Sequence, residues 1–204
     1  MCSISLEKYY LLKNNYYEML YRRGYYVEKK VLNLNYSQFK KKCIEKKRYF
    51  KSFKIINHLN DTNNKIIGFY NNKGLIDVNY LGLKIEKAKT NNSNSIIFIT
   101  KRYLSKQTNI ALSHFRRNFN IEIFFEYEIL INPIKHFLVP KHVLLAPDIK
   151  RKILKSYNVK DSQLPKIKLS DPISKYYGAK KGNMFKIIRF SENIGVYLSY
   201  RIIN

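Results

Sequence analysis

The sequence predicts an α/β first domain followed by a small α+β second domain, and three observations carry this prediction. The chain has 204 residues, enough for one large domain or two small ones. Its five prolines all lie between positions 133 and 172, which marks a shift in composition near Pro133 and Pro140. Strand-like runs alternate with helical patterns before that shift. We therefore assign residues 1–134 to the first domain and 135–204 to the second.

The beginning of the first domain is expected to be helical. Apolar residues recur at three- and four-residue steps from position 6 to position 20, and Gly24 follows them. This pattern predicts an amphipathic helix that ends at a glycine. A second helix is expected over residues 37–47. The β-rich runs 52–59 and 65–71 are separated by a short polar segment, which favours a β-hairpin.

The rest of the first domain predicts parallel strand pairing. Residues 81–89 have a helical pattern, and SIIFIT at 95–100 is typical of a short buried strand. A helix is expected over 105–115, followed by a long strand over 121–131. A strand, a helix and a second strand in this order form a βαβ unit, in which the two strands are parallel.

The second domain is expected to mix short helices with a pair of strands. A helix is predicted to begin at Pro147 and to end near Tyr157. Asp171 is expected to cap a short helix that has Pro172 at its first position and Gly178 just beyond its end. Between Pro133 and Pro140 the chain is expected to be extended. The two strands are expected at 184–190 and 196–203.

The charge of the chain points to a polyanion. Lys and Arg number 39 against 14 Asp and Glu, which gives a net charge of +25. Nucleic acid and anionic membranes attract such proteins, but abundant Lys, Asn, Ile and Tyr are also typical of an AT-rich genome, so charge alone does not decide. No apolar run approaches the roughly 18 residues of a spanning helix. With only two cysteines, we expect a soluble protein of a reducing, intracellular compartment and no membrane partner.

A search for catalytic and ligand-binding motifs yields none. The segment GAKKGN at 178–183 lacks the Lys-Ser/Thr pair of a phosphate-binding loop. His136 and His142 lack the spacing of metal ligands. Cys43 lies among lysines that would lower its pKa, but no base accompanies it at a defined spacing. We therefore predict no catalytic residue, no metal site, no cofactor and no small-molecule substrate.

Acidic residues offer one competing hypothesis, a free-standing nuclease. Such an enzyme needs clustered acids that bind a divalent metal. Asp77 and Glu86–Lys87 come nearest to that arrangement but lack the order of a known motif. Glu122, Glu126 and Glu128 would share one face of the expected long strand, where alternating polar residues usually face water.

One turn of the first domain has a positive argument for binding phosphate. Ser105 is expected to cap the helix that follows the strand 95–100, and Lys101, Arg102 and Lys106 surround it. A helix N-terminus offers free N–H groups and the positive end of the helix dipole. The turn is therefore a candidate contact for a DNA backbone; the alternative is a charged loop beside an ordinary cap.

Strings of residues in the last third carry a family resemblance. They closely resemble the fifth common subunit of eukaryotic nuclear RNA polymerases, whose smaller archaeal homologue corresponds to this third alone. YRRGYYV at 21–27 and SIIFIT resemble the eukaryotic N-terminal extension in order. The chain departs from the family at Lys141, where the family usually has Glu. The matching strings are HFLVPKH at 136–142, QLPKI at 163–167, DPISKYYGAKKG at 171–182, KIIRFSE at 186–192 and GVYLSYR at 195–201.

The resemblance implies a noncatalytic subunit of DNA-directed RNA polymerase, located in a nucleus or in a relict nucleus such as a nucleomorph. The second domain would be an assembly domain that docks on the largest subunit and joins the other polymerase subunits. The first would be a jaw domain near downstream duplex DNA, with weak, sequence-independent contacts. A free-standing basic nucleic-acid-binding protein or nuclease is the alternative. The implied assembly residues are Pro140, His142, Pro165, Asp171, Pro172, Tyr176, Tyr177, Gly178, Gly182, Arg189, Glu192, Gly195, Tyr200 and Arg201.

Overall fold

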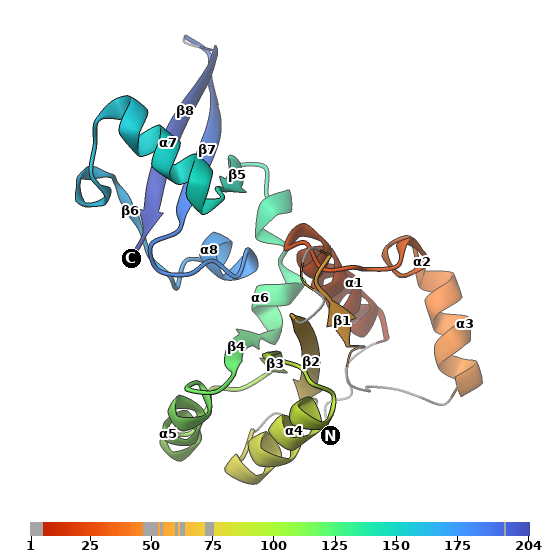
Figure 1. Ribbon diagram of the computed structural model, residues 1–204. Coiled ribbons are helices and arrows are strands. Elements are labelled where there is room, and N and C mark those ends of the chain that lie inside the picture. Colours follow the sequence, from red (N-terminus) through yellow and green to blue (C-terminus); the bar gives the residue numbers. More distant parts are fainter. Residues whose placement is uncertain are drawn as a thin grey trace. The chain divides into compact units, whose positions relative to one another are not determined.

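The computed structural model forms two compact units, Met1–Ile131 and Asn132–Asn204 (Figure 1). The first unit therefore ends at Ile131, whereas the expected junction lies after residue 134. Each unit is described by itself below. The structure describes residues 6–46, 53, 55–59, 61, 64–71, 76–193 and 195–204.

The first unit contains a four-stranded sheet with the strand order β1-β2-β3-β4. The strands β2 (Lys65–Asn71), β3 (Ser95–Thr100) and β4 (Asn120–Phe125) are parallel, which confirms the expected βαβ unit. The edge strand β1 (Ile56–Asn57) pairs antiparallel with β2. Of the first run of the expected hairpin, 52–59, only Ile56 and Asn57 form a strand. Residues 52 and 54 of that run lie outside the described part.

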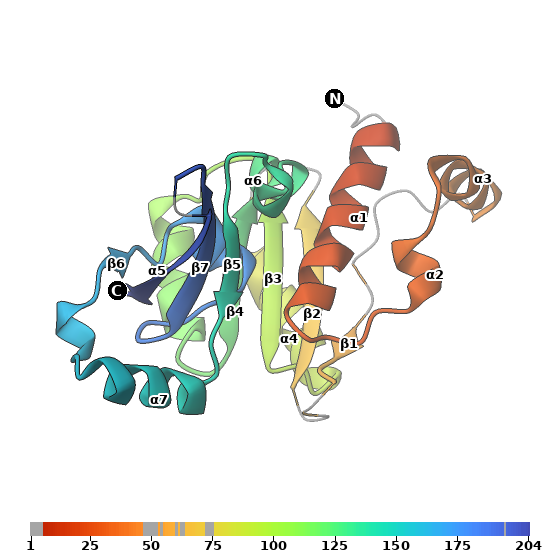
Figure 2. The same ribbon diagram turned by 90° about the horizontal axis from the view of Figure 1, so that it is seen from above.

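Helices cover both faces of this sheet, as Figure 2 shows. Helix α1 (Leu6–Arg22) lies on one face, where Tyr9 packs against Tyr70 of β2. Helices α4 (Val78–Thr90) and α5 (Lys106–Phe115) lie on the other face, over a core that includes Phe69 and Phe98. Because both faces are buried, the central strands read as continuous apolar runs without a polar alternation.

The end of α1 confirms the expected glycine stop. Gly24 has φ +88°. Its N–H donates to the carbonyl of Tyr21, and the Tyr25 N–H donates to the carbonyl of Leu20, at 3.1 and 3.0 Å. This pair of bonds satisfies carbonyl groups that the last helical turn leaves open. Two helices follow, α2 (Lys29–Leu32), which the sequence did not predict, and α3 (Tyr36–Lys46), which matches the second expected helix.

The prediction of one long strand over 121–131 is wrong. β4 ends at Phe125, and a short helix α6 (Glu126–Leu130) follows. The Glu128 carboxylate accepts a hydrogen bond from the Phe125 N–H at 2.8 Å, so the side chain closes a helical turn. Glu122 therefore lies on β4 while Glu126 and Glu128 lie on α6, so the three do not share a strand face. The amide of Asn15 on α1 donates to the carbonyls of Ile129 and Leu130 at 3.0 Å each, which ties the two helices together.

The second unit has a four-stranded sheet with the order β5-β7-β8-β6. The two expected strands are present as the antiparallel pair β7 (Met184–Ser191) and β8 (Gly195–Ile203). The short edge strands β5 (Lys141–Leu144) and β6 (Lys166–Ile167) were not predicted, and β6 runs parallel to β8. Four residues or fewer give too little pattern for sequence reasoning to separate a strand from a loop.

The helices of the second unit largely follow the sequence signals. α7 (Pro147–Tyr157) matches the expected helix. Before α8 (Pro172–Tyr176), the Asp171 carboxylate accepts from the Ile173 N–H at 2.9 Å, which confirms the cap, and Gly178 has φ +60°. The extended segment expected after Pro133 is wrong at its start, because η1 (Pro133–Lys135) forms there under a cap from Asn132. A second 3₁₀ turn, η2, covers Asp161–Gln163.

Candidate nucleic-acid interface and assembly surface

The turn between β3 and α5 is built around Ser105. Its hydroxyl accepts from the Thr108 N–H at 3.2 Å, so the predicted N-cap is confirmed. The buried Thr108 hydroxyl donates to the carbonyl of Ile76 at 3.0 Å. This second bond anchors the beginning of α5 to the segment that leads into α4. The exposed Ser105 and Lys106 therefore stand on a fixed first turn of the helix.

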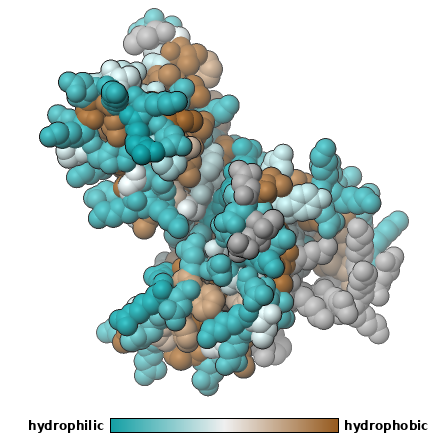
Figure 3. All heavy atoms as spheres, in the orientation of Figure 1, coloured by the Kyte–Doolittle hydropathy of each residue, from teal (hydrophilic) through white to brown (hydrophobic). Residues whose placement is uncertain are grey.

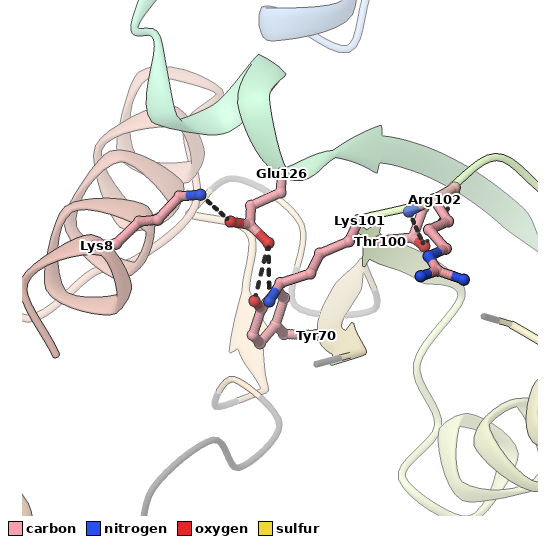
Figure 4. A network of polar contacts seen from close by, with 6 residues as sticks. All are labelled: Lys8, Tyr70, Thr100, Lys101, Arg102 and Glu126. Carbon is pink, nitrogen blue, oxygen red and sulfur yellow. Dashed lines mark hydrogen bonds and ion pairs between the residues drawn. The ribbon is translucent and has the colours of Figure 1, made fainter. Parts of the chain in front are cut away.

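Arg102 is held by a second local contact in the same turn. Its N–H donates to the Thr100 hydroxyl at 3.3 Å, and that hydroxyl donates to the Arg102 carbonyl at 3.0 Å. Thr100 is the last residue of β3 and is fully buried. Figure 4 shows the Arg102 guanidinium directed away from the buried carboxylate of Glu126. The backbone is thus fixed while the cation stays in solvent, as a phosphate contact requires.

Lys101 lies in a different environment from the other two cations. Its Nζ is 4.0 Å from the carboxylate of Glu126, which also binds Lys8 Nζ at 2.8 Å and accepts from the Tyr70 hydroxyl at 3.0 Å (Figure 4). Glu126 is only 5% exposed. Burial raises the pKa of Tyr70, and the Glu126 charge raises it further. The charge of Lys101 is therefore partly balanced by the buried carboxylate of Glu126, whereas Arg102 and Lys106 face solvent.

Sequence reasoning considered Glu126 only as a residue of a long strand and did not connect it, or Lys8, with this turn. The register pairs Thr100 with Phe125, so the ends of β3 and β4 are neighbours. Glu126, the next residue after Phe125, enters the same edge of the sheet because β4 stops there. Only a correct prediction of that strand end would have revealed the contact with Lys101.

The histidines, the cysteine and the helices that were considered for other roles can be located in the described part of the chain. Among the described residues, no group of three His, Cys, Asp or Glu side chains could hold a metal ion. His136 Nδ1 accepts from the Leu138 N–H at 3.3 Å, and His142 Nδ1 lies 2.7 Å from the carbonyl of Pro140. The Cys43 side chain is buried, and burial raises its pKa. No helix in the described part of the chain has the length and apolarity needed to cross a membrane.

Two of the expected assembly residues, His142 and Tyr177, meet around Phe185 of β7. The rings of His142 and Tyr177 pack against Phe185 with centroids 5.8 and 5.6 Å away. The Tyr177 hydroxyl donates to the carbonyl of His142 at 2.9 Å, which joins α8 to β5. Burial lowers the pKa of His142, and the charges of Arg189 and Arg201 act in the same direction.

The remaining expected assembly residues are dispersed over the unit. Asp171, Pro172 and Gly178 shape the ends of α8, and Tyr176 is buried in the core. Pro165 is exposed and accepts from the Ile202 N–H at 2.9 Å. The others lie on the hairpin or at turns: Gly182 precedes β7, Arg189 lies on β7, Glu192 lies in the hairpin turn, and Gly195, Tyr200 and Arg201 lie on β8.

One apolar surface of the second unit was missed by the sequence reasoning. Ile188 pairs with Leu198 and Phe190 pairs with Val196, so these four side chains lie on one face of the β7–β8 pair. We name these four residues the hairpin face. Phe190 is 84% exposed, and Val196 and Leu198 are exposed as well. Figure 3 shows brown, apolar spheres near the hairpin tip at the top of the view. The hairpin face is therefore a candidate interaction surface.

Comparisons with known proteins match both units. The N-terminal domain of RNA polymerase Rpb5 matches residues 4–87, and the C-terminal domain of RNA polymerase Rpb5 matches residues 131–203. The DNA-directed RNA polymerases I, II, and III subunit rpabc1 of Dictyostelium discoideum is 33% identical over 144 residues, which cover 70% of this chain and 73% of that protein.

Two further relatives match over nearly the whole length. The RPABC1 subunit of RNA polymerases I, II, and III from Caenorhabditis elegans is 28% identical over 210 residues and covers 100% of both chains. Subunit 5B of RNA polymerases IV and V from Arabidopsis thaliana is 29% identical over 203 residues, 99% of this chain and 92% of the relative. With both domains matched in order, the chain belongs to the RNA polymerase Rpb5 family.

Proposed function

We propose that this chain is a noncatalytic common subunit of nuclear DNA-directed RNA polymerases. In this proposal the second unit docks on the largest subunit, and the β3–α5 turn of the first unit lies against the backbone of downstream duplex DNA. The observation that carries the proposal is the full-length match to subunits named for polymerases I, II and III. A nuclear location follows from the same names. Copurification of the large catalytic subunits in stoichiometric amount with the tagged chain tests it.

The hairpin face supports the docking role of the second unit. Covering its exposed apolar side chains with a partner stabilises the complex by about 25 cal/mol per Å² of apolar surface buried. We expect Phe190→Ser combined with Leu198→Ser to reduce the large subunit recovered with the tagged chain. Because both side chains are exposed, the melting temperature should stay near that of the parent.

Leu169→Ser is the matched control for this experiment. Leu169 is also an exposed apolar residue of the second unit, but it lies outside the hairpin face. We expect the Leu169 variant to recover the large subunit at the parental ratio. Equal recovery by the double variant would place the docking surface elsewhere on the unit.

The β3–α5 turn supports a contact with DNA that is independent of base sequence. Arg102 and Lys106 present cations beside the capped first turn of α5, where anions are favoured. Each phosphate neutralised adds about 0.9 to the slope of log affinity against log salt. Reversing Lys101, Arg102 and Lys106 to Glu should flatten the salt dependence of elongation-complex stability while assembly and the catalytic step persist.

A charge-matched control separates the turn from the total charge. Lys29, Lys30 and Lys40 are exposed residues of α2 and α3, and their reversal changes the net charge equally. We expect crosslinking to downstream DNA to fall only for the turn variant. Equal losses for both triple variants would show that total charge, rather than this turn, governs the contact.

A further inference from the structure

Three aromatic side chains lie together beside the β3–α5 turn. Tyr103 follows Arg102 in the turn, Phe125 ends β4, and Tyr127 lies on α6. The ring centroids of Tyr103 and Phe125 are 4.7 Å apart, and those of Phe125 and Tyr127 are 5.6 Å apart with an interplanar angle of 5°. We name these three residues the aromatic ladder. It stands where the neighbouring strands β3 and β4 both end.

The two tyrosine rings of the ladder are exposed to solvent, although aromatic rings contribute most to stability when they are buried. Tyr103 is 76% exposed and Tyr127 is 53% exposed, while Phe125, which both tyrosine rings contact, is partly buried. The side chains of Tyr103 and Tyr127 also hydrogen-bond to each other. The backbone beneath Phe125 is held by the Glu128 carboxylate at 2.8 Å. The rings therefore form an ordered apolar surface that the described residues of the unit leave largely uncovered.

Cations border the ladder, and both acids of α6, Glu126 and Glu128, already have hydrogen-bond partners. Arg102 directly precedes Tyr103, and both Arg102 and Lys106 are exposed. The Glu126 carboxylate is buried with Lys8 and Tyr70, and Glu128 bonds to the backbone. An exposed aromatic surface with an excess of positive charge fits a ligand that combines flat π faces with phosphates.

We propose that the aromatic ladder is a stacking platform for unpaired bases of single-stranded nucleic acid. A base stacks on the exposed face of Tyr103 or Tyr127, while Arg102 and Lys106 contact the adjoining phosphates. Stacking of bases on aromatic side chains tolerates any sequence. A duplex hides its base faces, so this platform selects unpaired strands. The inference goes beyond the proposed function, which concerns the backbone of duplex DNA.

The test compares two oligomers of equal charge on the full chain. One is a dye-labelled oligothymidylate of about 12 nucleotides, within the usual range of single-strand sites, and the other is an abasic oligomer of the same length. Anisotropy titrations at one salt concentration give the two dissociation constants. We expect the parent to bind the oligothymidylate at least about fivefold more tightly, since stacking contributes about 1–3 kcal/mol per base.

Variants at the ladder separate stacking from charge and from folding. Tyr103→Ala should remove most of the preference for the oligothymidylate, and Tyr103→Phe, which keeps the ring, should restore it. Tyr157→Ala is the control, because Tyr157 is an exposed tyrosine of the second unit. Equal binding of the two oligomers by the parent, or an unchanged preference in Tyr103→Ala, overturns the proposal. Reversal of Arg102 and Lys106 should weaken the binding of both oligomers alike and leave the preference for the oligothymidylate unchanged. The duplex contact is tested separately by the crosslinking experiment above.

Discussion

Arg23 and Glu122 form a bidentate ion pair that joins the end of α1 to β4. The two guanidinium nitrogens of Arg23 lie 2.9 and 2.8 Å from the two carboxylate oxygens of Glu122, across 99 positions of sequence. The Arg23 side chain is buried, and its guanidinium also lies 5.8 Å from the centroid of the Phe124 ring. The pair therefore fixes one end of the first helix on the sheet.

Glu122→Gln should lower the free energy of unfolding by about 3 kcal/mol, because it leaves a buried guanidinium without its anion. Urea unfolding of the full chain measures the loss. Glu18→Gln is the control, since Glu18 and Arg22 form an exposed pair at 3.4 Å, which contributes about 0.5 kcal/mol or less. Similar losses for the two variants would contradict a structural role for the Arg23 pair.

Gly68→Ala should destabilise the first unit by about 1–3 kcal/mol through overpacking. A Cβ at this position of β2 would lie 2.4 Å from the Tyr16 hydroxyl and 2.9 Å from Phe53 Cδ2. Gly82→Ala is the opposite case, because no atom lies within 4 Å of its Cβ in α4. That variant should gain up to about 1 kcal/mol from helix propensity. Thermal melting distinguishes the two signs, and a stable Gly68→Ala protein would refute the close approach of α1.

Asp171→Ala should cost about 1 kcal/mol of stability as a lost helix cap. Gly178→Val should cost more, because Gly178 has φ +60° and a β-branched residue is strained there. Both variants should also assemble less well, through the fold of the second unit. If both variants melt like the parent and incorporate at normal stoichiometry, the ends of α8 contribute neither to the stability of the second unit nor to its assembly.

The stability of the second unit should fall as the pH decreases through about 6.5. Burial lowers the pKa of His142 from its ordinary 6.5, with Arg189 and Arg201 acting in the same direction against Pro140 and Asp171. The unfolded chain then binds a proton more readily than the folded chain, so the loss begins near 6.5 and levels off below the folded pKa. His142→Asn should flatten melting temperatures measured between about pH 5 and 8. A parent with the same flat profile would exclude this linkage.

A fragment of residues 132–204 should fold without the first unit, since it has its own sheet, caps and core. Dispersed amide NMR signals and a cooperative thermal transition are the expected results. A fragment that begins at 136 lacks Asn132 and the whole of η1, which contacts α8, and should melt at a lower temperature. A 132–204 fragment without a cooperative transition would show that the unit needs its neighbour.

The sequence predicted the elements with strong local signals, and it missed the early end of β4 and the two short edge strands of the second unit. Ser105, Asp171 and Gly178 carry their own cap chemistry, and the structure confirms all three caps or stops. The run 121–131 has the apolar content of a strand, but a carboxylate from Glu128 ends β4 early. β5 and β6 are too short to show a period and exist only because β7 and β8 offer them edges.

The sequence predicted where the three cations of the β3–α5 turn lie, but it did not predict which acids lie near them. Sequence spacing placed Lys101, Arg102 and Lys106 in one turn, which the structure confirms. It gave no sign that Lys101 approaches Glu126, because that contact depends on where a different strand ends. The aromatic ladder was hidden for the same reason, since Tyr103 and Tyr127 become neighbours only through the pairing of β3 with β4.

The bonds from Asn15 to the carbonyls of Ile129 and Leu130 give the first unit an order of assembly during translation. A ribosome releases α1 long before it has synthesised α6, so the Asn15 bonds form only after more than half of the protein has been made. Before that, its apolar face packs only against elements made earlier, such as β2, where Tyr9 contacts Tyr70. The second unit, whose long strands join through a tight turn, can fold soon after its last residues emerge.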